Sequence, residues 1–216
     1  MKRFYYYLTF IIVLLILSAC INKSPPEEMY EKLEKVATIE QTFEEQQEPL
    51  ILLEKKEKEI YNKIIELGMK HSEEVKSLAI EATEIVEKRK EHIENERKSL
   101  EASKEEFLTT SSIIDEMEEK KLQEIARKLY KTMNNRYSSY DKMYKNYLQA
   151  LKLDHDLYNK LQNKNAQIKE LQNLVTEINQ LYIKINEENE MFNSETKRYN
   201  EIKVSFYKKA GIAVND

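Results

Sequence analysis

The chain has few of the residues that end or cross-link secondary structure. Its 216 residues include two glycines, three prolines, one cysteine and no tryptophan. Glycine and proline are the main residues of tight turns, so their scarcity leaves little room for β-hairpins. A single cysteine cannot form a disulfide within the chain. Glu, Lys, Leu, Ile, Asn and Gln dominate instead, a composition typical of helical bundles and coiled coils.

Neither sign of charge is in large excess. The chain holds 35 Lys and Arg against 39 Asp and Glu. Residues 1–19 carry two of the basic residues and no acidic ones, so the remainder has a net charge of about −6. The charges are interspersed, as on solvated helix faces. This balance disfavours binding to nucleic acid, teichoic acid or anionic lipid over the whole surface.

The one cysteine follows an apolar segment close to the N-terminus. Lys2 and Arg3 precede an unbroken apolar run over residues 10–17, and the next residues complete the sequence Leu17-Ser-Ala-Cys20. The run is shorter than the ~20 residues that span a bilayer. It predicts a signal peptide over residues 1–19. An uncleaved signal anchor with an incidental cysteine is the alternative.

Leu17-Ser-Ala-Cys20 resembles the lipobox of bacterial lipoproteins. The resemblance implies cleavage between Ala19 and Cys20 and a diacylglyceryl group on the Cys20 sulfur. Two acyl chains hold a protein at a membrane far more firmly than one. We therefore expect a lipid anchor at the extracytoplasmic face of the bacterial cell membrane.

Residues 20–26 are expected to form a short tether, and residues 27–211 a helical domain. Helix breaks are predicted at Gly68–Ser72, where Gly68 ends a helix and Ser72 caps the next, at Thr109–Ser112, and at Gln162–Ala166; Gly211 ends the last helix. Pro49 is interpreted as a kink within the first helix, because the apolar spacing continues through it.

Apolar residues recur at the 3–4 spacing of amphipathic helices in all four segments. The last segment is the most regular. The residues that carry the spacing in these segments are, in order, Val36, Phe43, Leu50 and Ile64; Val75, Ala79, Ala82, Val86, Ile93, Leu100 and Phe107; Leu122, Ala126, Leu129, Met133, Tyr140 and Tyr147; and Leu171, Ile178, Ile185, Phe192, Tyr199 and Phe206.

These segments predict an all-α fold, an elongated antiparallel up-and-down bundle of four long helices. Helices of ~40 residues are ~60 Å long. A three-helix, spectrin-like rod is the alternative, and it requires one predicted break to be continuous helix. With four helices, Gly211 should lie beside Glu27; with three, at the opposite end.

No residue pattern indicates catalysis, a cofactor or a metal. His71, His92 and His155 are the only histidines, and no two have the His-x-x-x-His spacing of a metal site on one helix. Asp154-His155-Asp156 is contiguous, so the three side chains point in different directions on a helix. A glycine-rich phosphate loop is absent. We expect a protein that is not an enzyme.

Tyrosines gather in the third segment. Six of the 14 lie between residues 130 and 158, and Tyr130, Tyr137, Tyr144 and Tyr158 share one heptad position. One interpretation is an aromatic stripe that binds glycan or a partner. The other, which we favour, places the rings at the flank of the core with their hydroxyls reaching water.

Five stretches of the chain resemble the YkyA-type cell-wall-binding lipoproteins of Gram-positive bacteria. They are residues 45–50 (EQQEPL), 64–70 (IIELGMK), 97–107 (RKSLEASKEEF), 151–154 (LKLD) and 206–211 (FYKKAG). The resemblance implies association with the cell wall and a helical extracellular fold, and it implies no catalytic residues.

We therefore expect a membrane-anchored, non-catalytic binding or scaffold module of the cell envelope, with peptidoglycan as a partner. The alternative is a structural or regulatory coiled-coil accessory that binds another envelope protein. A solute receptor is disfavoured, because such receptors need two α/β lobes and residues 20–216 contain no strand-like apolar runs.

Overall fold

The computed structural model describes residues 23–68 and 71–213. The predicted signal peptide, with Ala19 and Cys20, lies outside the described residues. Within them the secondary structure is entirely helical, in the elements α2 (Pro25–Ile39), α3 (Gln41–Leu67), α4 (Ser72–Leu108), α5 (Thr110–Asp115), α6 (Lys120–Leu161) and α7 (Ile168–Ala210). No described helix has an apolar stretch long enough to cross a membrane.

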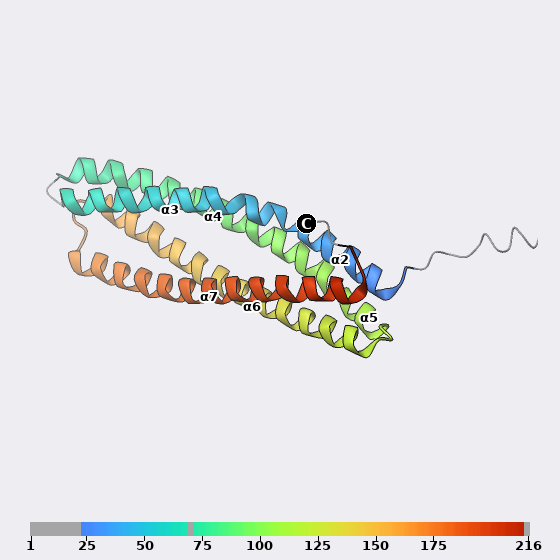
Figure 1. Ribbon diagram of the computed structural model, residues 1–216. Coiled ribbons are helices and arrows are strands. Elements are labelled where there is room, and N and C mark those ends of the chain that lie inside the picture. Colours follow the sequence, from blue (N-terminus) through green and yellow to red (C-terminus); the bar gives the residue numbers. More distant parts are fainter. Residues whose placement is uncertain (1–22, 69–70, 214–216) are drawn as a thin grey trace, which may run out of the picture.

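The helices form an elongated antiparallel bundle with four rods (Figure 1). α2 and α3 together make the first rod, α4 with the short α5 the second, α6 the third and α7 the fourth. α3 pairs with α4, and α6 with α7. The predicted all-α four-helix bundle is confirmed, and the three-helix rod is wrong.

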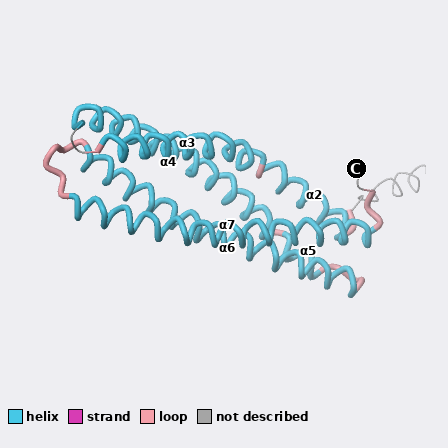
Figure 2. Tube along the Cα trace, turned by 60° about the vertical axis from the view of Figure 1, so that its left-hand side comes forward, coloured by secondary structure: helices cyan, strands magenta, loops and turns pink. Residues whose placement is uncertain are grey.

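The start of α2 and the end of α7 lie at the same end of the bundle, as four antiparallel rods require (Figure 2). The rings of Tyr30 and Tyr207 are 5.0 Å apart at their centres. The hydroxyl of Tyr207 donates to the Glu34 carboxylate at 2.8 Å. We call this the near end. The opposite end, which holds the α3–α4 and α6–α7 connections, is the far end.

α2 begins at Pro25, two residues before the predicted start of the helical domain. Proline suits the first helical position, because its missing N–H has no partner there in any case. The Ser24 amide and hydroxyl both donate to the Glu27 carboxylate, at 2.9 and 2.8 Å. This local bonding caps the helix, so Pro25 and Pro26 belong to α2 and not to the tether.

The first rod is interrupted at Glu40, where the sequence predicted continuous helix. The Ser99 hydroxyl on α4 donates to the Ile39 carbonyl at 2.7 Å and accepts from the Phe43 amide at 3.2 Å. It thereby satisfies backbone groups that the break leaves without helical partners. Pro49 lies inside α3, which continues on both sides of it.

The breaks predicted at Gly68–Ser72, at Gln162–Ala166 and at Gly211 fall where the sequence placed them, whereas most of the break predicted at Thr109–Ser112 is helical and belongs to α5. Gly68 and Gly211 end α3 and α7 with positive φ angles of 63° and 71°, which glycine adopts without strain. Ser72 is the first residue of α4 and not its cap, since His71 occupies the cap position. Between α4 and α6 the chain adds the single-turn helix α5 before residues 116–119 form the connection.

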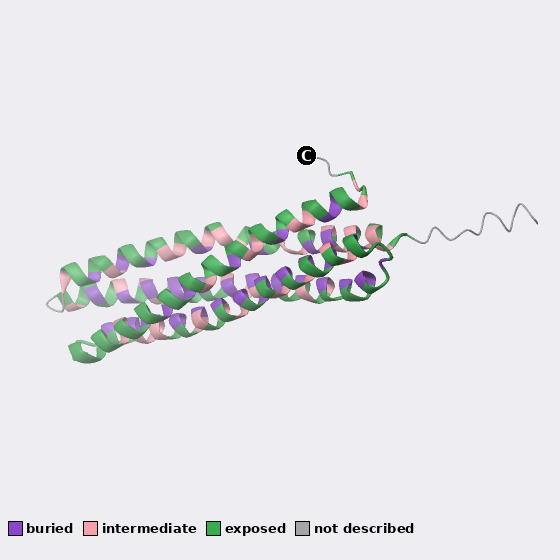
Figure 3. Cartoon of the chain, turned by 60° about the horizontal axis from the view of Figure 1, so that its bottom comes forward, coloured by how far each residue is buried: buried purple, intermediate pink, exposed green. Residues whose placement is uncertain are grey.

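The apolar heptad positions face the bundle axis and are buried, except Leu171, which is partly buried (Figure 3). Ala79, Ala82, Leu129 and Phe206, for example, have no exposed surface. Ten polar residues share this interior, and they are Glu57, Arg89, Glu96, Ser99, Ser103, Thr110, Thr132, Arg136, Ser139 and Asp154. Buried polar groups need partners, and their partners define the candidate site.

Candidate functional site

The tyrosines predicted as a stripe lie against the core. Tyr137 and Tyr158 are each only 2% exposed. The ring of Tyr130 stacks on Phe107 at 5.5 Å, and that of Tyr144 stacks on Tyr140 at 6.3 Å. The four rings therefore pack inward from α6, and they do not form an exposed aromatic face.

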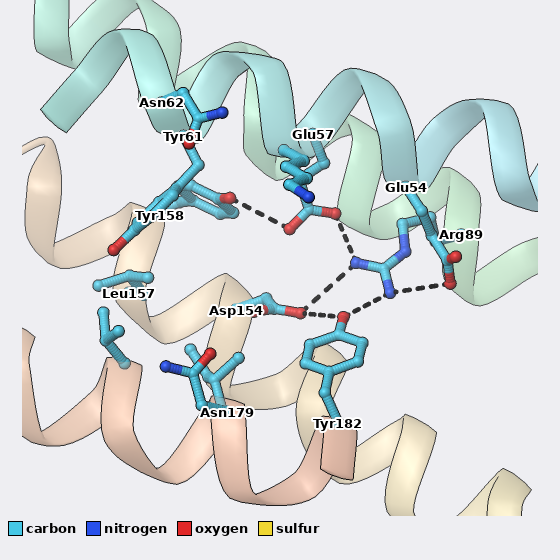
Figure 4. Close-up of a pocket in the computed structure, with 13 residues that line it drawn as sticks. Glu54, Glu57, Tyr61, Asn62, Arg89, Asp154, Leu157, Tyr158, Asn179 and Tyr182 are labelled. Atoms are coloured by element: carbon cyan, nitrogen blue, oxygen red, sulfur yellow. Dashed lines mark hydrogen bonds and ion pairs between the residues drawn. The ribbon is translucent and has the colours of Figure 1, made fainter. Parts of the chain in front are cut away.

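A groove lies between α3 and α7, with α4 and α6 contributing to its floor (Figure 4). Its inner cavity has a volume of about 520 Å³, within the range of small-ligand sites. It is lined by Glu54, Glu57, Lys58, Tyr61 and Asn62 of α3, Arg89 of α4, Asp154, Leu157 and Tyr158 of α6, and Val175, Ile178, Asn179 and Tyr182 of α7. On each helix these residues are three or four positions apart, which places them on one face.

Arg89 is the centre of the inner cavity and is 1% exposed. Its guanidinium has five N–H groups, and five short contacts surround them. Nη1 meets the carboxylates of Glu57 at 2.5 Å and Asp154 at 3.5 Å. Nη2 donates to the hydroxyls of Tyr182 at 2.6 Å and Tyr147 at 2.8 Å, and Nε donates to Tyr147 at 3.0 Å. Arg89 is therefore fully engaged by the protein.

The tyrosine hydroxyls around Arg89 donate to carboxylates. Tyr147 donates to Glu54 at 2.7 Å, Tyr158 to Glu57 at 3.1 Å and Tyr182 to Asp154 at 3.1 Å. Burial raises the pKa of each of these tyrosines far above the physiological range. The hydroxyls thus stay neutral donors, and each has its proton committed.

Asp154 is the carboxylate of this cluster whose pKa is raised by its surroundings. Burial and the neighbouring Glu57 charge raise its pKa to about 7, although Arg89 and the Tyr182 hydroxyl favour the ionised form. Its Oδ2 accepts from Tyr182 and Arg89. Among the described residues its Oδ1 has no hydrogen-bond partner, while Asp154 lines the cavity. The Arg89 guanidinium therefore forms ion pairs with two buried carboxylates, those of Glu57 and Asp154.

Several polar groups on the groove walls make no side-chain hydrogen bond within the described part of the chain. They are Lys58, Tyr61 and Asn62 on α3 and Asn179 on α7. Lys58, Asn62 and Asn179 are exposed, at the rim of the cavity. The rim therefore offers donors and acceptors, while the interior holds the charged cluster.

Toward the far end the groove continues as an apolar cavity of about 610 Å³. Tyr61 and Val175 line both cavities, so the two are contiguous. Ile65 of α3 and Ile168 of α7 stand at its edges, 62% exposed each. The α3–α7 groove, meaning both cavities together, is thus apolar at its outer end and charged at its inner end.

Sequence reasoning missed Arg89 and Asp154 as site residues. The available signal was polar residues at core heptad positions. Arg89 lies seven residues after Ala82, and Asp154 seven after Tyr147. Glu57 stands between Leu50 and Ile64 on the spacing of the first segment. Each interrupts an apolar series at a position where a charged side chain must be buried and paired.

Two further polar clusters lie in the core, closer to the near end of the bundle than the α3–α7 groove. Arg136 makes two contacts of 2.8 Å with the Glu40 carboxylate at the α2–α3 break. Glu96 accepts from Gln47 at 2.5 Å and from Tyr140 at 3.3 Å. Neither adjoins the α3–α7 groove, so we interpret both as structural.

The α3–α7 groove offers recognition and not an evident catalytic set. Its inner cavity is lined by no serine, threonine, cysteine or histidine. The described residues also contain no cluster of three or more side chains suited to a metal ion. What the geometry supports is non-covalent binding of a ligand with both apolar and polar parts.

The fold and the groove define a class, an all-α bundle protein with a ligand-sized groove between its first and last rods. The chain belongs to the YkyA family, described as "Putative cell-wall binding lipoprotein", whose model matches residues 24–209. The protein named "Uncharacterized lipoprotein YkyA" from Bacillus subtilis (strain 168) is 34% identical over 198 residues, covering 92% of this chain and 89% of that protein.

The fold also occurs in a solved structure. A 1.6 Å crystal structure of a conserved protein of unknown function from Staphylococcus aureus matches with a TM-score of 0.73. The match covers 84% of this chain and 91% of that one, at 14% sequence identity. This likeness concerns the fold alone.

Proposed function

We propose that this protein is a non-catalytic binding module, held at the extracytoplasmic membrane face by a diacylglyceryl group on Cys20, whose α3–α7 groove binds a component of the cell wall. The family description supports the lipoprotein character and the wall as ligand source. The Leu17-Ser-Ala-Cys20 sequence supports the anchor.

The geometry agrees with such a role. α2 begins five residues after Cys20, so the near end of the bundle lies within ~20 Å of an anchored cysteine. α7 has 43 residues, and a helix of that length extends ~65 Å. A bundle standing away from the membrane would carry the far end of the groove toward the wall.

The observation that carries the proposal is the composition of the α3–α7 groove. An apolar outer cavity continues into a charged inner cavity, and rim amides on α3 and α7 make no bonds within the described structure. An ordinary bundle interface would close these faces against each other. A groove of this kind suits a ligand with small aliphatic groups next to polar ones.

The test is co-sedimentation of the lipidated full-length protein, purified in detergent, with purified wall sacculi. Asn179→Trp places a large ring at the exposed rim of the groove, and we expect it to reduce binding at least tenfold. Gln180→Trp is the matched control, because residue 180 is exposed on the same helix and does not line the groove. Equal binding by both variants, or none by the unmodified protein, would contradict the proposal.

A second candidate function is binding of another envelope protein. The observation that favours it is the pair of isoleucines at the outer cavity, since Ile65 and Ile168 expose most of their surface. Apolar side chains at a groove edge are common in protein interfaces. Cross-linking from position 168 in cells separates the candidates: capture of one defined protein, without sacculus binding, would select this one.

A further inference from the structure

We propose that the α3–α7 groove recognises a free primary ammonium group of a wall peptide, of the lysine type, which binds at the Asp154 carboxylate while its aliphatic neighbours pack on Leu157, Val175 and Ile178. This inference rests on the proposed function and names the chemistry that the groove selects.

The first argument is that the floor of the inner cavity, around Arg89, offers hydrogen-bond acceptors and few donors, in contrast to the rim. All five N–H groups of Arg89 point at protein oxygens. The three tyrosine hydroxyls around it donate to Glu54, Glu57 and Asp154. A ligand carboxylate or phosphate would therefore find no uncommitted donor at the cavity floor. An ammonium has three donors and no acceptor, and it matches what remains.

The second argument is charge. Three carboxylates, those of Glu54, Glu57 and Asp154, line the inner cavity with one guanidinium among them, that of Arg89. Lys58 is the other basic lining residue, and it is exposed at the rim. When all three acids are ionised, the interior carries an excess negative charge. A cationic ligand group would balance it, and an anionic polymer would be repelled.

The third argument is the Asp154 side chain itself. The residue is 96% buried, since 4% of its surface is exposed. Its Oδ1 has no hydrogen-bond partner among the described residues, and Asp154 lines the cavity. Among the described residues the fully buried side-chain oxygens without a partner are Glu188 Oε2 and Glu195 Oε2, so Asp154 Oδ1 is open to the cavity, where it can accept a hydrogen bond from an ammonium. The nearby wall of Leu157, Val175 and Ile178 would then contact the ligand's methylene and methyl groups.

A neutral glycan fits these features less well. Sugar hydroxyls both donate and accept, and at the floor their acceptor function would meet only carboxylates and committed hydroxyls.

Binding of an ammonium should be accompanied by proton release. The groups that interact with Asp154 are Glu57 on α3, Arg89 on α4, Tyr158 on α6 and Tyr182 on α7. Of these, the Glu57 carboxylate opposes ionisation of Asp154, and a bound cation would offset its charge. Because the pKa of Asp154 is about 7 in the free protein, affinity for the amine should rise between about pH 6 and about pH 8.

The experiment titrates the lipidated full-length protein in detergent with acetyl-Ala-Lys-Ala-amide and with the same peptide acetylated at the lysine amine. We expect binding of the amine form, at least a tenfold loss on acetylation, and a similar loss in Asp154→Asn. Asp156→Asn is the matched control on the same helix outside the groove and should bind normally. Thermal unfolding of each variant verifies that the bundle is intact.

A parallel arm distinguishes this inference from the proposed function. Sacculi are sedimented with the protein before and after their amines are acetylated, and we expect acetylation to reduce binding at least tenfold. Sacculus binding that survives acetylation would leave the proposed function standing and overturn the ammonium inference. Binding of the amine peptide without sacculus binding would support the ammonium site and overturn the wall assignment. No discrimination between the two peptides would also overturn the inference.

Discussion

At Arg89 the bundle holds a full positive charge in its core, between two buried carboxylates and two tyrosine hydroxyls. Removing one partner of a buried ion cluster leaves the others without compensation. The cluster joins residues from all four rods, so it also restricts how the rods can shift along one another. We infer that the Arg89 cluster forms the floor of the groove and also holds the four rods in the positions that create it.

We expect Arg89→Met to lower the free energy of unfolding by about 3–5 kcal/mol, because Glu57 and Asp154 would remain buried without a cation. Urea denaturation followed by circular dichroism measures the change. Arg127→Ala is the control: Arg127 pairs with Asp115 on the surface, where both side chains are more than half exposed, and such pairs contribute about 0–1 kcal/mol. An Arg89→Met protein as stable as the Arg127→Ala protein would show that the cluster is dispensable.

The proposed membrane anchor depends on one residue, Cys20. We expect Cys20→Ala to abolish incorporation of labelled fatty acid, since the thiol is the predicted attachment point. Metabolic labelling and detergent-phase partitioning are the measurements. A Cys20→Ala, Ser24→Cys double variant tests position, because a thiol four residues later should not be acylated. Labelling that persists in either variant would contradict the assignment.

At the scale of elements, α4 shows how polar residues are built into a helical core. Ala82, Arg89, Glu96 and Ser103 follow one another at intervals of seven on its inner face. Arg89 meets Glu57, and Ser103 donates to Glu40 at 2.6 Å. Glu96 has no cation among its hydrogen-bond partners, which are Gln47 and Tyr140. α4 thus makes a different polar contact in each layer, and this favours one register of the rods.

Glu96 should make stability depend on pH. Burial raises its pKa to about 8, with a smaller contribution from the Glu54 charge. Between the unfolded pKa of about 4.5 and this value the folded state binds more protons, so stability falls as pH rises, by up to about 1.4 kcal/mol per pH unit. We expect urea midpoints to decrease from about pH 6 to about pH 8 and the decrease to be smaller in Glu96→Gln.

In Glu96→Gln, stability should still decrease as pH rises, although less steeply. The cause is Asp154, whose raised pKa of about 7 has the same effect on stability. Surface carboxylates with lowered pKa, such as Asp141 beside Arg97, act below about pH 4 and lie outside this range. The double variant Glu96→Gln, Asp154→Asn should therefore have nearly constant stability across it. Identical slopes for the single variant and the unmodified protein would contradict the role of Glu96.

At the scale of the whole molecule, the even number of rods places both ends of the domain together. A consequence is that a lipid on Cys20 would hold the near end at the membrane, and the α3–α7 groove would open toward the far end. The groove lies between the first and last rods, which are neighbours in the bundle but pack less closely than α3 with α4 or α6 with α7. The position of the proposed binding surface thus follows from the topology.

Spin labels can measure this arrangement. On a Cys20→Ala background, labels at Glu28→Cys and Lys208→Cys should be within about 25 Å of each other, because the two helix ends are adjacent. Labels at Glu28→Cys and Lys164→Cys should be separated by about 50–65 Å, the length of a rod. Double electron–electron resonance gives both distances. Similar values for the two pairs would be incompatible with four antiparallel rods.

A feature of the bundle could be predicted from the sequence where its cause lies in nearby residues, and could not where its cause is a contact with a distant part of the chain. Gly68 and Gly211 end helices because their backbone angles are intrinsically accessible to glycine, so those breaks were visible. The break at Glu40 was hidden, because Val36 and Phe43 keep the seven-residue spacing across it. What stabilises that break is Ser99, 59 residues later in the chain, and no local pattern reports such a contact.

The sequence by itself determined that the chain forms four long helices, because a 3–4 apolar spacing requires each segment to bury one face and interspersed charges keep the other in water. Only the tertiary structure decided which buried polar residues meet. Arg89 lies 32 residues from Glu57 and 65 from Asp154, and periodicity specifies the face of a helix without specifying its partner. The groove has the same origin, since it depends on how closely two rods approach, which the packing of all four rods determines.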